Sequence, residues 1–215
     1  GILYRFDFWK GYSMNKIILA SKSPRRIELL QMCGLDFSSL AADIDEGLIK
    51  SHILADSREK STFDQAKILT ERLAREKALH VYRQKKDHYV IGSDTLVVTD
   101  KSILGKPMDS HDAYKMLKNL AGQVHRVYTG VSIVGPDYED SFVSIAQVKF
   151  HDLDLAMDQI IKDYIATGSP MDKAGSYGIQ DMGALLVEYI EGDYYTIMGL
   201  PIGQVYRKLK SLNLK

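Results

Sequence analysis

The chain of 215 residues contains a single cysteine, Cys33, and five prolines. One cysteine excludes both an internal disulfide and a zinc site built from cysteines, and it is typical of a protein kept in a reducing cytoplasm. No apolar run approaches the roughly 18 residues that a membrane-spanning helix requires. The 28 basic and 28 acidic residues balance, so the basic excess typical of nucleic-acid binding is missing. We therefore expect a cytoplasmic protein that binds neither membranes nor nucleic acids.

Several catalytic signatures are missing as well. The sequence has no G-x-x-x-x-G-K spacing of a P-loop, and its six histidines form no H-E-x-x-H pattern. It also lacks the serine elbow and the cysteine–histidine pattern of enzymes that form covalent intermediates. In an enzyme, these absences favour direct attack by water.

Residues 1–13 differ in character from the rest of the chain. They are rich in aromatic side chains and interrupted by charges, so they lack the unbroken apolar region of a signal peptide. We expect them to be an extension, added for expression or by an upstream start. Residues 14–215 are expected to form a single domain, which at this length can have two lobes and bury a substantial core.

The apolar pattern of residues 14–215 predicts both helices and strands. Helices are expected at 24–33, 62–86, 110–121, 155–167 and 201–211. Strands are expected at 17–20, within 35–47, and at 89–91, 96–98, 103–104, 124–134 and 142–150, with a final hairpin of 184–190 and 194–198. Residues 48–61 show no periodicity and are expected to be irregular.

This order of elements predicts the fold class. Helices and strands alternate early and hairpins follow, which is typical of an α/β fold with a twisted mixed β-sheet flanked by helices. Four loops are expected to meet at one rim of that sheet: 21–25, 92–95, 104–107 and 172–181.

The first of these loops is typical of an anion site. Ser23 occupies the position of an N-cap and Pro24 that of the first helical residue. The open end of a helix offers unpaired N–H groups and a positive dipole. Arg25 and Arg26 add charge there, and arginine can bind phosphate through two parallel hydrogen bonds.

Two carboxylates are candidate site residues. Asp94 lies between two apolar runs and precedes Thr95. A carboxylate near a strand end can hold a divalent cation or take a proton from water; the alternative is an aspartate that caps a turn. Glu46 lies near the end of an acidic run. Either Glu46 or Asp45 could supply a second carboxylate to a magnesium ion, unless the run is simply a solvated loop.

Basic and amide side chains complete the candidate set. Lys106 follows Gly105, which allows close backbone approach, so this lysine is either a point charge for a phosphate or an ordinary turn lysine. Lys77 lies on the small-residue side of its helix, although most helical lysines face solvent. The glycine-rich run 172–180 suits a wall around a ligand or a purely structural loop, and the Gln180 amide could read the edge of a base. Together with the carboxylates, these residues suit metal-assisted hydrolysis of a nucleotide polyphosphate.

Taken in order, the motifs resemble those of the Maf family of nucleoside triphosphate pyrophosphatases, also called septum-formation inhibitor proteins. The resemblance runs from about Lys16 to Leu209. Its blocks are Leu-Ala-Ser-Lys-Ser-Pro-Arg-Arg (19–26), Gly-Ser-Asp-Thr (92–95), Leu-Gly-Lys-Pro (104–107), Ala-Tyr-Lys-Met-Leu-Lys-Asn-Leu-Ala-Gly-Gln-Val-His (113–125), Asp-Lys-Ala-Gly-Ser-Tyr-Gly-Ile-Gln (172–180) and Gly-Leu-Pro (199–201). Each block alone is weak, but the ordered set is highly specific.

The resemblance implies a two-lobed fold with a central cleft, similar to that of the inosine triphosphate pyrophosphatases. It implies cleavage between the α and β phosphates, giving a nucleoside monophosphate and pyrophosphate, with a divalent cation (Mg²⁺ or Mn²⁺) as cofactor and a homodimer as assembly. Carried over position by position, the catalytic proton acceptor is Asp94, and the metal-binding carboxylates are Glu46 and Asp94. The implied substrate-binding residues are Ser21, Arg25, Lys77 and Lys106.

The resemblance also implies a substrate preference. Arg25, Thr95 and Gln180 match the branch that acts on dTTP and UTP, rather than the branch that acts on 7-methyl-GTP. This chain departs from the usual pattern at Ser93, where alanine is usual, and at Asp181, where glycine is common; its stretch between residues 46 and 77 is also longer than usual. The alternatives are a pyrophosphatase for noncanonical purine or modified nucleotides, and a nucleotide-binding regulator of cell division.

Overall fold

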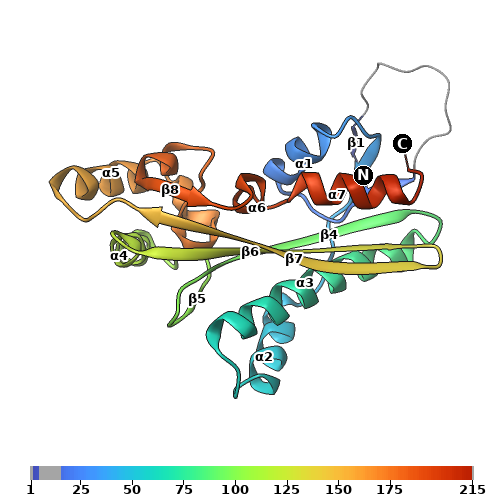
Figure 1. Cartoon of the computed structure of the whole chain (residues 1–215), viewed down its shortest axis with the longest axis horizontal. Helices are drawn as coiled ribbons and strands as arrows, with labels where there is room; N and C mark the ends of the chain where they lie inside the picture. The colour runs from blue at the N-terminus through green and yellow to red at the C-terminus, as the bar shows by residue number, and fades with distance from the viewer. Residues whose placement is uncertain (1, 5–15, 215) are drawn as a thin grey trace.

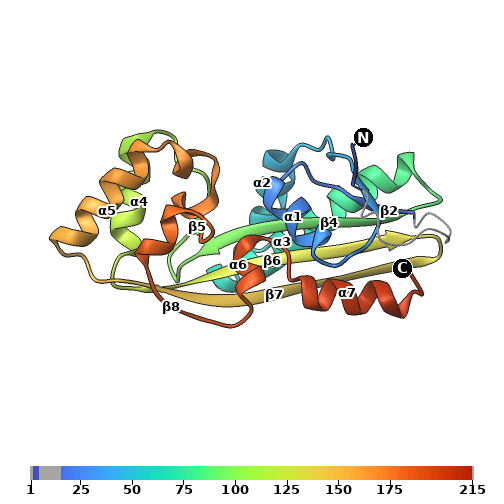
Figure 2. The same cartoon turned by 90° about the horizontal axis from the view of Figure 1, so that it is seen from above.

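The computed structural model describes residues 2–4 and 16–214, which are built around one mixed β-sheet of eight strands (Figures 1 and 2). The strands are β1 (Ile2–Tyr4), β2 (Ile17–Leu19), β3 (Phe37–Ser39), β4 (Tyr89–Val98), β5 (Ile103–Leu104), β6 (Val124–Gly135), β7 (Tyr138–Phe150) and β8 (Val187–Glu191). Their order is β1-β3-β2-β4-β6-β7-β8, with β5 paired to β4. Strand β2 runs parallel to β3 and β4, whereas the other pairs are antiparallel. The predicted mixed sheet is therefore confirmed.

Helices flank this sheet on both sides. They are α1 (Pro24–Gln31), α2 (Glu46–Asp56), α3 (Thr62–Gln84), α4 (Ser110–Leu120), α5 (Leu155–Ala166), α6 (Tyr194–Met198) and α7 (Ile202–Ser211). Three 3₁₀ turns, η1 (Ser169–Asp172), η2 (Ala174–Ser176) and η3 (Met182–Leu186), fill the glycine-rich segment. Figure 1 shows α2 and α3 on one side of the sheet and α1 and α7 on the other.

The long strands β6 and β7 connect two lobes (Figure 2). One lobe packs α1 and α7 against β2 and β4, around Leu19, Leu29 and Leu209. The other packs α4 and α5 against the far ends of the long strands, around Leu117 and Ile161. Since the two buried clusters are separate, the expected two-lobed arrangement is present.

Two glycines allow α3 to lie directly against the sheet. A Cβ atom on Gly92 of β4 would stand 2.1 Å from the carbonyl oxygen of Ala74, and one on Gly130 of β6 would stand 2.3 Å from that of Thr70. No side chain fits at such distances, so only glycine permits this approach. The close packing places Lys77 of α3 beside the middle of β4.

Three local predictions are wrong. Residues 92–95 are not a loop, because β4 is continuous and Asp94 pairs with Gly130 inside it. Residues 48–61 are not irregular: they include most of α2, which buries none of its side chains and so shows no apolar periodicity. Residues 194–198 are not the second strand of a hairpin but helix α6, whose N-cap is Asp193.

The helix that follows β2 forms as predicted. Ser23 caps α1 by accepting a hydrogen bond from the backbone N–H of Arg26, and Pro24 is the first helical residue. The predicted extension covers residues 1–13, of which 1 and 5–13 lie outside the described residues. Residues 2–4 form β1 at the edge of the sheet, and the boundary at residue 14 stays a prediction.

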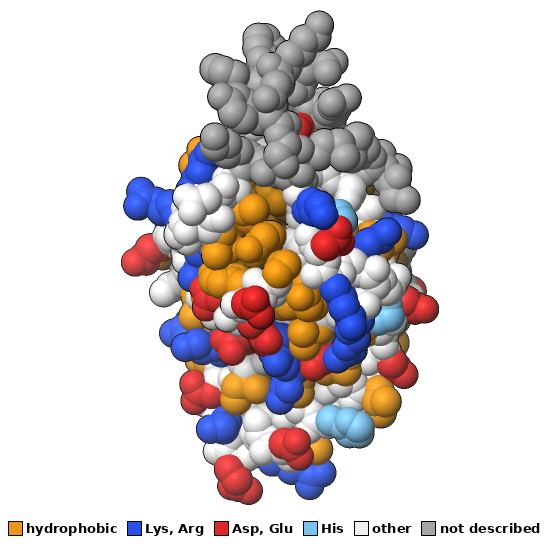
Figure 3. All heavy atoms as spheres, turned by 90° about the vertical axis from the view of Figure 1, so that its right-hand side faces the viewer, with side chains coloured by type: hydrophobic (Ala, Val, Ile, Leu, Met, Phe, Trp, Pro, Cys, Tyr) orange, Lys and Arg blue, Asp and Glu red, His pale blue; other side chains and the backbone are white. Residues whose placement is uncertain are grey.

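One face of the molecule carries both acidic and basic side chains. Figure 3 shows acidic and basic side chains interspersed among apolar ones on the face at the right of Figure 1. No helix within residues 2–4 and 16–214 combines the length and apolar character that crossing a bilayer needs.

Candidate active site

A cavity of about 530 Å³ lies between the two lobes. Its walls include seven of the eight predicted site residues: Arg25, Glu46, Lys77, Asp94, Thr95, Lys106 and Gln180. They come from the starts of α1 and α2, the middle of α3 and β4, the segment after β5 and the segment after η2. The fold therefore brings residues from six separate parts of the chain to one cavity.

The centre of the site is a lysine between two carboxylates. Nζ of Lys77 lies 2.9 Å from Oδ1 of Asp94 and 3.1 Å from Oε1 of Glu46. The Lys77 and Asp94 side chains are 13% and 10% exposed, whereas that of Glu46 is 54% exposed. The Lys77–Asp94 pair is therefore the better shielded from water, and Glu46 reaches it from the open side.

Asp94 has an unused acceptor. Its Oδ2 atom is buried and, in the described part of the chain, accepts no hydrogen bond. Because buried carboxylate oxygens are normally paired, an unpaired one points to a missing partner. Such an oxygen can take a proton from water or bind a cation.

Glu46 and Asp94 are the acidic side chains of the site that could hold a divalent cation. No group of three or more histidine, cysteine, aspartate or glutamate side chains suited to a metal occurs among the described residues. A magnesium ion, however, usually binds one or two carboxylates and completes its shell with water and phosphate oxygens. Glu46 and Asp94, with the unpaired Oδ2, fit that requirement.

Three cations of the described structure line the cavity without a hydrogen bond or ion pair of their own. Within residues 2–4 and 16–214, the side chains of Arg25, Lys50 and Lys106 make no hydrogen bond or ion pair, although all three line the cavity. Cations left unpaired in a concave site attract anions. They lie on α1, α2 and the segment after β5, so they can contact different parts of an extended polyanion.

Arg26 has a different role from Arg25. Its Nε donates to the carbonyl oxygen of Gly199 at 2.8 Å, and a terminal nitrogen donates to the Thr95 hydroxyl at 2.9 Å. Burial lowers the pKa of Arg26, an effect that the nearby Asp94 carboxylate opposes. Arg26 therefore ties α1 to β4 and to the turn after α6.

The Thr95 hydroxyl is engaged by protein groups. Besides accepting from Arg26, it lies 2.9 Å from the Thr129 hydroxyl, which itself donates to the carbonyl of Thr196. The neighbouring Ser93 is buried and donates to the Gly199 carbonyl at 3.0 Å. Both side chains thus help to hold the loop after α6 against β4.

Ser21 is the predicted site residue that does not line the cavity. It is 9% exposed, its hydroxyl accepts a hydrogen bond from the Ser23 N–H at 3.1 Å, and its carbonyl accepts one from Ser39. In this position Ser21 shapes the loop before α1. Its role in binding substrate stays a prediction.

Lys50 and Lys173 were not among the predicted site residues. Lys50 lies one turn after Glu46 on α2, so both residues line the cavity. The sequence indicates this spacing only if residues 46–56 are recognised as a helix. Lys173 belongs to the motif 172–180 and lines the cavity, but its ammonium is held by Ser169, Asp172 and Asp181. A sequence motif does not reveal such internal pairing.

Comparisons with known proteins agree with the motifs. A profile of the family described as Maf-like protein matches residues 16–212. The chain is similar to proteins named dTTP/UTP pyrophosphatase from Aquifex aeolicus (strain VF5), with 42% identity over 199 residues (93% of this chain and 96% of that protein), and from Bacillus cereus (strain ATCC 10987 / NRS 248), with 40% identity over 205 residues (95% and 94%). A third, from Thermosipho africanus (strain TCF52B), is 45% identical over 191 residues (89% and 90%).

Proposed function

The chain belongs to the family of Maf-like proteins, and on that basis we propose that it hydrolyses nucleoside triphosphates, with dTTP and UTP as preferred substrates. Water attacks the α-phosphorus, the bond to the bridging oxygen between the α and β phosphates breaks, and a nucleoside monophosphate and pyrophosphate are released. The observation that carries the proposal is the largely buried Lys77–Asp94 pair in a cavity with unpaired cations. The names of the similar proteins support the substrate.

Asp94 is the proposed proton acceptor. Its Oδ1 is held by Lys77 at 2.9 Å, and its Oδ2 has no partner in the described structure. The ammonium fixes the orientation of the carboxylate while the free oxygen remains available to a water proton. A positioned general base of this kind typically contributes a hundredfold or more to the rate.

Glu46 and Asp94 would together hold a divalent cation, Mg²⁺ or Mn²⁺. When bound, the ion would offset negative charge on the phosphate oxygens. Because the Lys77 ammonium contacts Oδ1 of Asp94 and Oε1 of Glu46, its positive charge would compete with a cation bound by the same two carboxylates. This competition predicts that mutation of Lys77 changes the metal concentration needed for activity.

The unpaired cations are the proposed phosphate ligands. Arg25 and Lys106, together with Lys77, would offset charge on the triphosphate and on the departing pyrophosphate, since positioned charge dominates catalysis of this type of reaction. Lys50 adds a cation on α2. The base would be selected by Arg25, Thr95 and Gln180, of which Gln180 is exposed and makes no side-chain hydrogen bond in the described structure.

The test is pyrophosphate release from a panel of dTTP, UTP, CTP, 7-methyl-GTP and ITP, with Mg²⁺ or Mn²⁺. We expect turnover of dTTP and UTP, and a loss of about a hundredfold or more in Asp94→Asn. Asp163→Asn, an exposed change on α5, serves as control. Preference for ITP would instead indicate a pyrophosphatase for noncanonical purine nucleotides. Tight nucleotide binding without release of pyrophosphate would indicate a nucleotide-binding regulator. Near-normal turnover in Asp94→Asn would show that the assigned base is wrong.

We further propose that residues 14–215 act as one domain, as a homodimer, in the cytoplasm. The single cysteine is compatible with a reducing compartment. Light scattering coupled to gel filtration tests the dimer, and fractionation of cells tests the location.

A further inference from the structure

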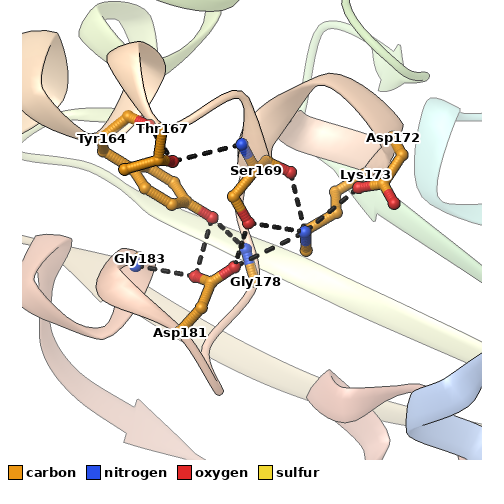
Figure 4. Close-up of polar contacts among 8 residues, drawn as sticks. All are labelled: Tyr164, Thr167, Ser169, Asp172, Lys173, Gly178, Asp181 and Gly183. Carbon is orange, nitrogen blue, oxygen red and sulfur yellow. Dashed lines mark hydrogen bonds and ion pairs between the residues drawn. The ribbon is translucent and has the colours of Figure 1, made fainter.

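A cluster of polar side chains lies behind the wall of the cavity, around Asp181 (Figure 4). One carboxylate oxygen accepts hydrogen bonds from the Tyr164 hydroxyl and from the Gly183 N–H, each at 2.8 Å. The other accepts from the Ser169 hydroxyl at 2.6 Å and lies 3.5 Å from the Lys173 ammonium. Asp181 thereby joins α5, η1 and η3 through a single carboxylate.

The carboxylate is held in its charged form. Burial acts to raise the pKa of Asp181, but the hydrogen bonds from Ser169, Gly183 and Tyr164 and the charge of Lys173 outweigh it, so the pKa lies below its ordinary value. Lys173 is 9% exposed, and its ammonium also donates to the carbonyl of Ser169 at 2.7 Å. The Asp181 carboxylate is therefore surrounded by three hydrogen-bond donors and the Lys173 ammonium.

This cluster restrains the backbone on both sides of Gln180. The Tyr164 hydroxyl accepts from the Gly178 N–H at 2.9 Å, two residues before Gln180, and Asp181 accepts from the Gly183 N–H three residues after it. The two glycines are in close contact, since a Cβ on Gly183 would stand 2.4 Å from the Gly178 carbonyl oxygen. The segment is thus folded tightly back on itself.

Gln180 has no anchor of its own. Its side chain is exposed, lines the cavity and makes no hydrogen bond within residues 2–4 and 16–214. The position of its amide therefore depends on how the backbone at residues 178–183 is held. The polar cluster supplies that restraint.

We propose that Asp181 is a positioning residue for base selection: by holding residues 178–183 through Tyr164 and Gly183, it sets where the Gln180 amide meets the base. This inference rests on the proposed function, because it assumes that Gln180 contacts the base.

The first measurement tests the restraint without using activity. Hydrogen exchange of the Gly178 and Gly183 amides should become roughly tenfold faster in Asp181→Asn, because the amide group loses the ion pair with Lys173 and part of its hydrogen bonding. Tyr164→Phe keeps the aromatic ring and removes the hydroxyl that bonds Asp181 and Gly178, so it should also speed exchange of these two amides. Asp163→Asn on the same helix should leave both exchange rates unchanged, and unchanged rates in the first two variants would overturn the proposal.

The second measurement tests base selection. The ratio of kcat/KM for UTP to that for CTP should fall roughly three- to tenfold in Asp181→Asn and Tyr164→Phe. In a Gln180→Ala background, Asp181→Asn should cause no further fall. Two outcomes would show that Asp181 is only structural. In one, amide exchange becomes faster while the UTP-to-CTP ratio of kcat/KM is unchanged. In the other, Asp181→Asn lowers that ratio equally in the Gln180→Ala background.

The two hypotheses fail in different ways. If the wild-type protein releases no pyrophosphate from any nucleotide, the proposed function fails, and base selection is then read from the dissociation constants of UTP and CTP by calorimetry in the same variants. If the wild type is active but its selectivity does not depend on Asp181, only the positioning role fails. Thermal unfolding of each variant confirms that the measurements are made on folded protein.

Discussion

Replacing Gly92 by alanine should damage both the stability of the fold and the candidate site. The new Cβ would stand 2.1 Å from the carbonyl oxygen of Ala74 and 2.8 Å from the N atom of Ala78. Ordinary van der Waals contact begins near 3.4 Å, so α3 and β4 must separate locally by roughly 1.3 Å at the closer contact. Both clashing atoms belong to a helix backbone, which cannot rotate away as a side chain can.

The size of the effect follows from these distances. Overpacking a core typically costs about 1–3 kcal/mol, and because the backbone must move here we expect at least about 3 kcal/mol. That is a large share of the roughly 5–15 kcal/mol that stabilises a domain. The same movement would break the 2.9 Å contact between Lys77 and Asp94, and a misplacement of about 1 Å can cost roughly a hundredfold in rate.

The assay is urea unfolding followed by circular dichroism, together with pyrophosphate release from dTTP under conditions where the variant is folded. Gly203→Ala is the matched control, because this glycine of α7 is exposed and, in the described structure, no atom outside its own helix and chain neighbours lies within 4 Å of the new Cβ. The control should be neutral or stabilised by about 0.5–1 kcal/mol, since alanine favours helix. Wild-type stability and turnover in Gly92→Ala would refute the reasoning.

Two further predictions concern a single side chain each. Lys50→Ala should raise KM for dTTP about three- to tenfold with little change in kcat, because it removes an unpaired cation that binds substrate and transition state alike. Lys60 is exposed and lies outside the cavity, so an equal rise in KM in Lys60→Ala would contradict this prediction. His125 is 1% exposed, and burial lowers its pKa to about 3. As the pH falls, the unfolded chain therefore takes up the proton before the folded chain does. The contribution of this residue to stability is present above the unfolded pKa of about 6.5, and about 2 kcal/mol of it is lost by pH 5. Urea unfolding at several pH values should show a flatter profile in His125→Gln, and an unchanged slope would mean that His125 is not the titrating group.

Much of the fold could be predicted because local signals agreed with the final packing. The N-cap Ser23 and the following Pro24 mark the start of α1, and the spacing of apolar residues along α3 follows the face that packs on the sheet. Helix α2 gave no such signal, because it buries no side chain and its apolar residues do not form one face. For α6, the run Tyr-Tyr-Thr-Ile favours a strand locally, but the Asp193 side chain caps a helix there instead.

The candidate site was predictable to a similar degree. Seven predicted residues line one cavity, because the motifs that carry them mark the segments that surround it. The environment of Asp94 was not predictable. Glycine and serine before an aspartate usually indicate a turn, whereas here Gly92 is required by the close approach of α3, and Ser93 is required to bond Gly199.

The sequence by itself determined the types of chemistry available: carboxylates, cations, a capped helix start and a glycine-rich wall, with no cysteine or histidine centre. Only the tertiary structure decided how these groups are paired. It placed Lys77 between Asp94 and Glu46, kept Arg25 free while engaging Arg26, and connected Asp181 to Tyr164. The physical reason is that caps and apolar periodicity act over a few residues along the chain. The pairing of charges depends instead on distances between segments that only the packed fold brings together.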